Sequence, residues 1–478
     1  MKSIAFAILV VATGACIAPS GVAARMPMEA SAPPAQTVAQ TTSQPPAQVE
    51  ANARQVIQNM NTGNFAAVES QFDAKMAAAL PAGKLGAQWA QIEPQFGKLQ
   101  SIENVTTGKV QTFDAAKLVL VFAQGQLDAT VAYDPDGKIA GIGLRPHQEE
   151  SQWQPPVYAK TASFTEKSLT LEDQGYELPG TLTVPNGPGP FPAIVLVQGS
   201  GPHDEDESIG PNKPFKDIAW GLASHGIAVY RYTKRTQKYG EKSATDPHLL
   251  TVNDETINDA RAAVALVAKQ PGINPEQVFL LGHSLGAYLA PRIATGNAVI
   301  AGIVIMGGNT RPIERVVVEQ IHYLANIGAM PSDEGEKQVA AAQEAVDQIE
   351  SKDLKPGDTV MFLGSTTYGA YWLDLRSYNP VKTAEKLKIP ILILQGGRDY
   401  QVTPANFSDW QSALGNRSNV TMKIYPDANH LFISGSGQSN PKEYEQAGHV
   451  DHAAIEAIAA WVLPSEYPGS LRGNNPTK

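Results

Sequence analysis

The sequence is poor in cysteine, in basic charge and in metal-ligand patterns. Its single cysteine, Cys16, cannot form an intramolecular disulfide, so a large core must stabilise the fold, which 478 residues can supply. The net charge of −10 argues against nucleic acids and anionic membranes as partners, because both are polyanions. His203 and Asp204 lack further ligands at a fixed separation, so we predict no metal and no cofactor. With 42% hydrophobic and 18% charged residues, the composition predicts a globular protein of two or three domains.

The N-terminal segment, residues 1–24, has the pattern of an export signal: a positive charge, an apolar run over residues 4–12 and then small residues. The run is too short to span a bilayer. Cys16 follows three residues that resemble a bacterial lipoprotein box, with Thr where Leu is common. Two outcomes stay open: Cys16 becomes a lipid anchor, or cleavage after Ala24 removes it. Both predict an exported protein, periplasmic or extracellular.

Two segments of different composition follow the signal. Residues 25–47 are rich in Pro, Ala and Gln and predict a disordered linker, because they have too few large apolar side chains to form a core. From residue 48 to 147, apolar residues recur first at helical spacing and then, after Pro94, in strand patterns. We therefore predict a small α+β domain. Its element order is similar to that of cone-shaped, nuclear-transport-factor-like domains of unknown function, and we expect it to pack or bind rather than to catalyse.

A second domain is predicted over residues 161–466, between a polar linker at 148–160 and a polar tail at 467–478. Its run from Ala193 to Val197 is continuously apolar, as in strands buried on both faces. Further strand patterns, separated by helical ones, lie at residues 227–230, 278–281, 299–306, 389–395 and 420–425. Repeated βα units build a doubly wound, mostly parallel sheet, and ligands bind beyond the carboxyl ends of its strands.

One of these strands ends in Gly282-His283-Ser284-Leu285-Gly286, the sequence form of a nucleophile elbow. The serine of such a motif occupies a strained turn between strand and helix, and the two glycines remove side chains that would collide with neighbouring backbone. The helix that follows points its N-terminus at any developing anion. The motif alone also fits a plain glycine-flanked turn, so the function depends on its neighbours.

Two further loops at the same edge of the sheet supply an acid and a base. Asp399 and His430 each follow a strand pattern, and Ser284, Asp399 and His430 occur in the order of α/β-hydrolase triads. His430 would accept the proton of Ser284 and return it to the leaving group, while Asp399 would hold the imidazole in the correct tautomer.

Other histidines and another aspartate near the end of the chain are alternatives to His430 and Asp399. His449 and His452 open the last helical pattern beside Asp451, where capping and solvent-facing positions are expected. Asp427 lies only three residues from His430 in the same loop and is expected in a surface turn.

An oxyanion hole needs two backbone N–H groups, one from the residue after the nucleophile and one from a loop after an early central strand. Leu285 supplies the first. The loop Gln198-Gly199-Ser200-Gly201 follows the first long buried strand and is expected to supply the second, from Ser200 or from Gly201. A plain glycine turn is the alternative.

Five runs together resemble a family of bacterial α/β-hydrolase esterases related to serine-aminopeptidase-like and dienelactone-hydrolase-like proteins. They are residues 199–204, 210–215, 231–236, 282–286 and 395–402. The resemblance covers about residues 160–465 and implies an α/β-hydrolase fold and hydrolysis of carboxylic esters by Ser284, Asp399 and His430. Thr233 stands where an Asp is usual in this family, which puts a local ion pair in question.

The segment 310–377 interrupts the alternation with helical patterns, and insertions at this place commonly form a lid. Several of its side chains, with His203, either line an acyl pocket or pack the insertion on the core: Ile321, Tyr323, Leu324, Tyr368, Tyr371 and Trp372. The acidic run at residues 204–207 is expected in a solvated loop, paired with Arg231, Lys234 or Arg235. It could instead bind a substrate amine.

The sequence thus predicts an enzyme: a carboxylesterase-type serine hydrolase that cleaves small or medium acyl esters through an acyl-enzyme. Its partner is a small-molecule ester. A peptidase or amidase using the same triad is one alternative, and a binding protein with a vestigial site is another.

Overall fold

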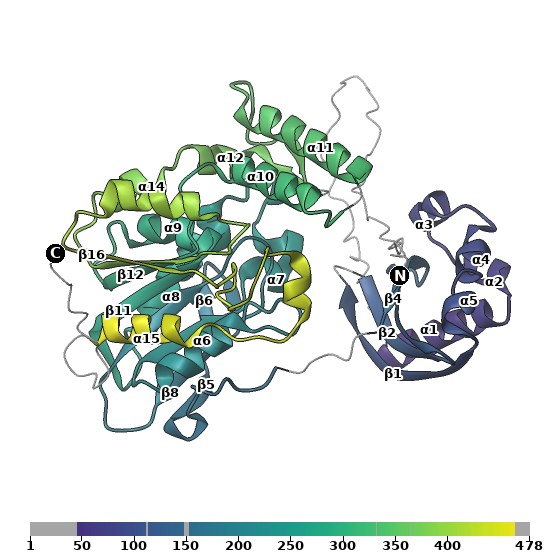
Figure 1. Ribbon diagram of the computed structural model, residues 1–478, viewed down its shortest axis with the longest axis horizontal. Coiled ribbons are helices and arrows are strands. Elements are labelled where there is room, and N and C mark those ends of the chain that lie inside the picture. Colours follow the sequence, from purple (N-terminus) through teal and green to yellow (C-terminus); the bar gives the residue numbers. More distant parts are fainter. Residues whose placement is uncertain (1–44, 111–112, 148–152, 331, 364, 464–478) are drawn as a thin grey trace, which may run out of the picture. The chain divides into compact units, whose positions relative to one another are not determined.

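The computed structural model describes residues 45–110, 113–147, 153–330, 332–363 and 365–463 of the chain. They form two compact units, one within residues 1–150 and one within residues 151–478 (Figure 1). The predicted export signal with Cys16, the linker up to residue 44 and the predicted polar tail lie outside the described residues. None of the described helices combines the length and the apolar character that crossing a membrane would require.

Unit 1 is an antiparallel sheet with short helices. Its helices are α1 (Pro46–Asn61), α2 (Phe65–Glu69), α3 (Ala74–Ala79), α4 (Lys84–Trp89) and α5 (Glu93–Phe96), and its strands are β1 (Leu99–Val110), β2 (Phe113–Phe122), β3 (Gly125–Tyr133) and β4 (Ile139–Pro146). The strands pair in chain order. Val56 and Met60 of α1 are buried with Leu118 of β2, so the apolar stripe of the helix faces the sheet. The predicted α+β domain is confirmed, although α1 begins at Pro46, inside the predicted linker.

Unit 2 contains an eight-stranded sheet of order β16-β15-β12-β11-β9-β10-β8-β5. These strands are β5 (Phe164–Ser168), β8 (Gly180–Pro185), β9 (Phe191–Val197), β10 (Ala228–Tyr232), β11 (Ile273–His283), β12 (Ile300–Met306), β15 (Ile391–Gly396) and β16 (Val420–Tyr425). Six strands are parallel, and β8 and β5 add antiparallel pairs at one edge. The predicted doubly wound sheet is confirmed. The central strands β9 and β12 are buried along nearly all of their length, as expected of strands covered on both faces.

Helices cover the two faces of this sheet in separate groups (Figure 1). The helices are α6 (Pro214–Ala223), α7 (Arg235–Tyr239), α8 (Asn258–Val267), α9 (Leu285–Ala294), α13 (Pro380–Ala384), α14 (Pro404–Leu414) and α15 (His452–Val462). Phe215 of α6 and Ile455 of α15 pack in one core with Ile194 of β9. Ala263 of α8, Leu289 of α9 and Leu414 of α14 pack in the core on the other face.

The insertion at residues 310–377 is partly helical. It contains α10 (Ile313–Asn326), α11 (Ser332–Glu350), the hairpin strands β13 (Thr359–Phe362) and β14 (Ser365–Tyr368), and α12 (Gly369–Arg376). Helical spacing predicted α10 and α11, but the hairpin was missed because its strands are only four residues long. A second small hairpin, β6 (Leu171–Asp173) and β7 (Tyr176–Leu178), lies earlier in unit 2.

Part of the predicted second linker packs on unit 2. Trp153 donates from Nε1 to Asp217 at 2.8 Å, and its ring contacts Trp220 edge-on, with the ring centroids 5.0 Å apart. Tyr158 donates to the carbonyl of Val450 at 2.8 Å. Residues 153–160 are therefore attached to unit 2 through two aromatic side chains, because Trp153 contacts Trp220 and Tyr158 packs on the core around α6 and α15.

Candidate active site

Ser284 forms the turn between β11 and α9. Its φ of 53° lies in the left-handed region, which few residues other than glycine adopt. A Cβ on Gly282 would collide with the backbone of Gly286, and a Cβ on Gly286 would collide with the carbonyl of Val197. Both glycines of the elbow are therefore sterically required. Ser284 N–H donates to the carbonyl of Met306 at 3.0 Å, which fixes the turn against the end of β12.

Asp399 and His430 form a buried pair beyond the ends of β15 and β16. Nδ1 of His430 lies 2.7 Å from Oδ2 of Asp399, and the side chains are 4% and 0% exposed. The other oxygen of Asp399 accepts the N–H groups of Gln401 and Val402, each at 2.8 Å. These bonds fix the position of the carboxylate. Because its second oxygen is an acceptor beside Nδ1, the proton of the neutral imidazole lies on Nδ1, and Nε2 is left to act as a base.

The pair lies beside the elbow. Gly307 follows the residue that accepts the Ser284 N–H, and a Cβ on Gly307 would be 3.6 Å from both Asp399 Oδ2 and His430 Nδ1. The ring of His283, next to the serine, lies 4.7 Å from the ring of His430. Among the described residues, no hydrogen bond to the Ser284 hydroxyl is present. Catalytic hydrogen bonds often form only when substrate is bound, so this open contact is compatible with a triad.

The loop after β9 lies against the serine. A Cβ on Gly199 would be 3.1 Å from Cβ of Ser284 and 3.6 Å from its Oγ. The N–H of Gly199 donates to Oε1 of Glu207 at 2.6 Å, and the Gly199 carbonyl accepts from Nζ of Lys234 at 2.7 Å. Both polar groups of Gly199 are thus engaged, and its N–H cannot serve an oxyanion. The amides of Ser200 and Gly201, which follow in the same loop, stay the candidates for the second donor.

Glu207 also connects this loop to the other two parts of the site. Its second oxygen lies 2.9 Å from Nδ1 of His283, and Nε2 of His283 lies 3.0 Å from the carbonyl of His430. The side chains of Glu207 and His283 are 2% and 5% exposed. A carboxylate and a carbonyl are both acceptors, so both nitrogens of His283 donate and the ring is an imidazolium.

The electrostatics agree with a charged Glu207–His283 pair. Burial opposes ionisation of Glu207, but the charge and hydrogen bond of His283 hold the pKa of Glu207 below its ordinary value. Burial likewise opposes protonation of His283, but Glu207 raises the pKa of His283 above its ordinary value. The sequence predicted His283 only as part of the elbow and Glu207 only as part of an acidic run. The two residues are 76 positions apart, and no motif in the sequence links them, so the pair could not be predicted.

The rest of the acidic run stabilises its own loop. Asp206 is paired with Arg231 at 2.8 Å and with Lys213 at 2.9 Å, and despite burial these cations keep the pKa of Asp206 low. Glu205 accepts from Thr181 at 2.9 Å. The run is therefore largely engaged in internal contacts, and only the pairing with Arg231 matches the ion pairs that the sequence suggested.

The two other basic residues of the suggested set have different partners. Lys234 pairs with Glu255 at 2.9 Å, and Arg235 pairs with Asp173 at 2.8 Å. Arg235 also pairs with the buried Asp259 at 2.5 Å, so both cations have buried partners although Thr233 stands where the family resemblance implies an Asp.

The predicted pocket residues lie in several environments. Nε2 of His203 lies 2.8 Å from the carbonyl of Ser200. Tyr371 donates to Glu255 at 2.9 Å, so α12 is connected through Glu255 and Lys234 to the loop after β9. Trp372 is 3% exposed and packs in the core, with Nε1 donating to Thr367 at 2.8 Å. The ring of Tyr368 contacts the ring of His248, with the ring centroids 4.5 Å apart.

The residues considered as alternatives to the triad have other partners. Nδ1 of His449 lies 3.1 Å from Asp217, and Asp451 caps α15 by accepting from Ala453 N–H at 2.7 Å. Asp427 is exposed, and its carbonyl accepts from Gly435 N–H at 2.9 Å, as expected of a surface turn.

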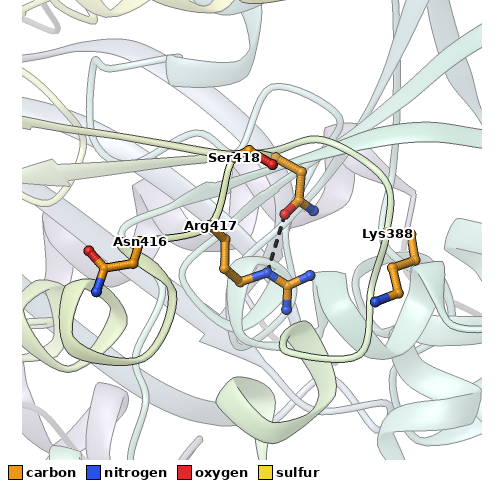
Figure 2. Close-up of a pocket in the computed structure, with 5 residues that line it drawn as sticks. Lys388, Asn416, Arg417 and Ser418 are labelled. Carbon is orange, nitrogen blue, oxygen red and sulfur yellow. Dashed lines mark hydrogen bonds between the residues drawn. The ribbon is translucent and has the colours of Figure 1, made fainter.

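A surface hollow of unit 2 lies where β15 and β16 begin, at the edge opposite Asp399 and His430. Its lining residues are Lys388, Asn416, Arg417, Ser418 and Asn419 (Figure 2). Arg417 donates to Asn419 at 3.2 Å and to the carbonyl of Leu387 at 2.6 Å. These contacts tie the loop before β16 to the loop before β15, so the hollow has a structural explanation.

Three features together define an α/β-hydrolase. They are a mostly parallel sheet, a strained serine between a strand and a helix, and an Asp–His pair beyond the ends of β15 and β16. A family model described as "Serine aminopeptidase, S33" matches residues 212–435, and one described as "Protein of unknown function (DUF3887)" matches residues 53–142. Esterase EstD of Thermotoga maritima is 37% identical over 407 residues, which cover 85% of this chain and 93% of that protein. The chain belongs to the family of this esterase and is a carboxylesterase-type hydrolase. The predicted resemblance is confirmed.

Other matches are more distant. A putative carboxymethylenebutenolidase of Synechocystis sp. is 23% identical over 131 residues, which cover 25% of this chain and 50% of that protein. Among solved structures, Est1E from Butyrivibrio proteoclasticus is 14% identical with a TM-score of 0.42 and covers 62% of this chain and 99% of its own.

Proposed function

We propose that the protein hydrolyses carboxylic esters of small or medium acyl chains through an acyl-enzyme, with Ser284 as nucleophile. His430 is the general base and Asp399 orients it. The observation that carries the proposal is the buried contact of 2.7 Å between Asp399 and His430 beside the strained turn of Ser284. A serine hydroxyl is inert unless a base takes its proton, and Nε2 of His430 is the nitrogen left for that task.

In the first half of the reaction, Ser284 Oγ attacks the ester carbonyl carbon while His430 Nε2 takes the hydroxyl proton. The carbonyl oxygen becomes an oxyanion, and the N–H groups of Leu285 and Ser200 donate to it. Each such donor contributes a factor of about 10² to 10³ in kcat. His430 then gives its proton to the alcohol oxygen, the C–O bond breaks and the alcohol leaves. In the second half, His430 deprotonates a water that attacks the acyl carbonyl carbon. The bond from that carbon to Ser284 Oγ then breaks, His430 returns the proton to Oγ, and the carboxylic acid leaves.

The same triad could cleave amides, with the acidic run at residues 204–207 receiving a substrate amine. The contacts of that run favour the ester. Asp206 already has Arg231 and Lys213 as partners, and Glu207 is buried against His283. A peptide amine would have to displace these partners.

The test compares p-nitrophenyl esters of increasing acyl length with aminoacyl anilides on the purified protein. We expect kcat/KM to be higher for the esters and to fall for long chains, whereas preference for the anilides would overturn the proposal. Labelling by a fluorophosphonate probe, absent in Ser284→Ala, separates a working site from a vestigial one.

The insertion at residues 310–377 is proposed as a lid, with His203, Tyr368, Tyr371 and Trp372 at or behind the acyl pocket. Export to the periplasm or the exterior, with or without a lipid on Cys16, is proposed from the N-terminal sequence. Mass spectrometry of the mature N-terminus distinguishes a lipidated Cys16 from cleavage after Ala24.

A further inference from the structure

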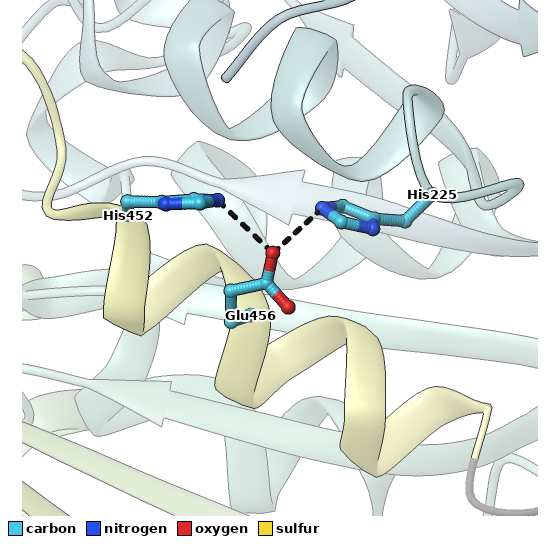
Figure 3. Close-up of side chains that lie close together, drawn as sticks. All are labelled: His225, His452 and Glu456. Carbon is cyan, nitrogen blue, oxygen red and sulfur yellow. Dashed lines mark ion pairs between the residues drawn. The ribbon is translucent and has the colours of Figure 1, made fainter. Parts of the chain in front are cut away.

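Two histidines and a glutamate of unit 2 that are not part of the proposed triad lie close together (Figure 3). Nε2 of His225 and Nε2 of His452 lie 3.2 and 3.0 Å from the same oxygen, Oε1 of Glu456. The three potential ligand atoms all lie within 4.8 Å of one another. His452 and Glu456 are one turn apart at the start of α15, and His225 comes from the loop between α6 and β10.

The three side chains are of the kinds that bind zinc. Imidazole nitrogens and carboxylate oxygens bind Zn²⁺ at about 2.0 to 2.2 Å, so two ligands of a tetrahedral ion lie about 3.3 Å apart. The two contacts to Glu456, 3.2 and 3.0 Å, are already close to that separation, and the two histidine nitrogens lie within 4.8 Å of each other. Small side-chain rotations would bring all three atoms around one ion and leave a fourth position for water.

The ligand side chains are held in place before any ion binds. The ring of His452 stacks on Tyr158, with centroids 5.2 Å apart and planes 9° from parallel. The side chain of His225 is only 8% exposed.

We propose that His225, His452 and Glu456 form a binding site for one zinc-like divalent cation that fastens α15 to the end of α6. The ion would replace the two contacts to Glu456 by three coordinate bonds. Because α15 directly follows the loop that carries His430, the expected consequence is higher stability of this part of unit 2. No part in the ester reaction is assigned to the ion.

The test titrates ZnCl₂ into the chelator-treated full chain. Affinity is measured by competition with a chromophoric chelator, and stability by the thermal midpoint. His452→Ala and Glu456→Gln change partly exposed side chains, so both variants should fold. His248→Ala is the matched control, because His248 is an exposed histidine 3.7 Å from a carboxylate oxygen of Asp246.

We expect one ion per chain and an increase of a few degrees in the midpoint for the wild type and the control, since a ligand that binds only the native state stabilises it. His452→Ala and Glu456→Gln should weaken binding by at least about 10-fold. Co²⁺ should give the visible absorption of a tetrahedral site, and this band should disappear in both variants. Equal zinc affinity in wild type and variants would show adventitious binding elsewhere and overturn the proposal. Failure of the wild type to bind zinc would overturn it as well.

Discussion

Replacing Glu207 by alanine should reduce both stability and turnover. The change removes the acceptor of Gly199 N–H at 2.6 Å and that of His283 Nδ1 at 2.9 Å. Both groups are buried, and each unsatisfied buried polar group costs about 1 to 3 kcal/mol, so the free energy of unfolding should fall by about 2 to 6 kcal/mol. The amide of Ser200 follows Gly199 directly. If its position shifts, kcat should fall by about 10- to 100-fold, part of the loss expected for an oxyanion donor.

The assay measures urea unfolding and the kinetics of a p-nitrophenyl ester for a set of variants. Glu207→Gln should restore much of the loss, because an amide can accept from Gly199 and donate to a neutral His283. Glu205→Ala is the control from the same acidic run, since Glu205 contacts Thr181 and not the site. A positioning role predicts that kcat falls while KM changes little. Wild-type kcat in Glu207→Ala, or an equal loss in Glu205→Ala, would refute the reasoning.

Three further predictions concern the same site. Asp399→Asn should lower kcat by about 10⁴-fold with the fold intact, because the imidazole loses its tautomer control; unchanged ester kinetics would exclude the assigned role. Ser284→Gly should be more stable to urea than Ser284→Ala by about 1 kcal/mol, since only glycine relieves the positive φ; equal stability would exclude strain. The stability difference between the wild type and Glu207→Gln should be greatest between about pH 4.5 and 6.5, the ordinary pKa values of the two groups. The lowered pKa of Glu207 gives stability that is lost in acid as the carboxylate protonates, and the raised pKa of His283 gives stability that is lost in alkali as the ring deprotonates. A difference in urea midpoint that stays the same well below pH 4.5 and well above pH 6.5 would contradict the pair.

The sheet and the order of the triad could be predicted because they depend on local patterns. Continuous apolar runs such as residues 193–197 mark strands covered on both faces, and β9 spans Phe191–Val197. In parallel strands, the residues after each carboxyl end meet at one edge. The sequence therefore suggested that Asp399 and His430 lie together, and the structure has them in hydrogen-bond contact.

Contacts between distant segments could not be predicted in this way. Glu207 resembled its neighbours in a charged run, and charged runs are usually solvated, but its φ of 51° accompanies a side chain turned inward. His225 is likewise far in sequence from its partners, since it lies 227 residues before His452 and 231 before Glu456. In both cases, tertiary packing determines which residue becomes the partner. Neither the hydrophobic periodicity nor the spacing of motifs in the sequence predicts that contact. The short hairpin of β13 and β14 was missed for a different reason, since four-residue strands give too few alternations to recognise.

Gly199 is the point at which these long-range contacts meet. Its N–H is held by Glu207, which through His283 also reaches the carbonyl of His430, and its own carbonyl is held by Lys234. A loop that must present one amide to an oxyanion loses catalytic power if it moves by about 1 Å. Glycine loops are flexible by nature, so the two buried charged side chains on either side of this peptide supply the rigidity that its own residues lack. The elbow motif therefore places the proposed nucleophile, whereas Glu207 and Lys234 determine where the proposed oxyanion loop lies relative to it.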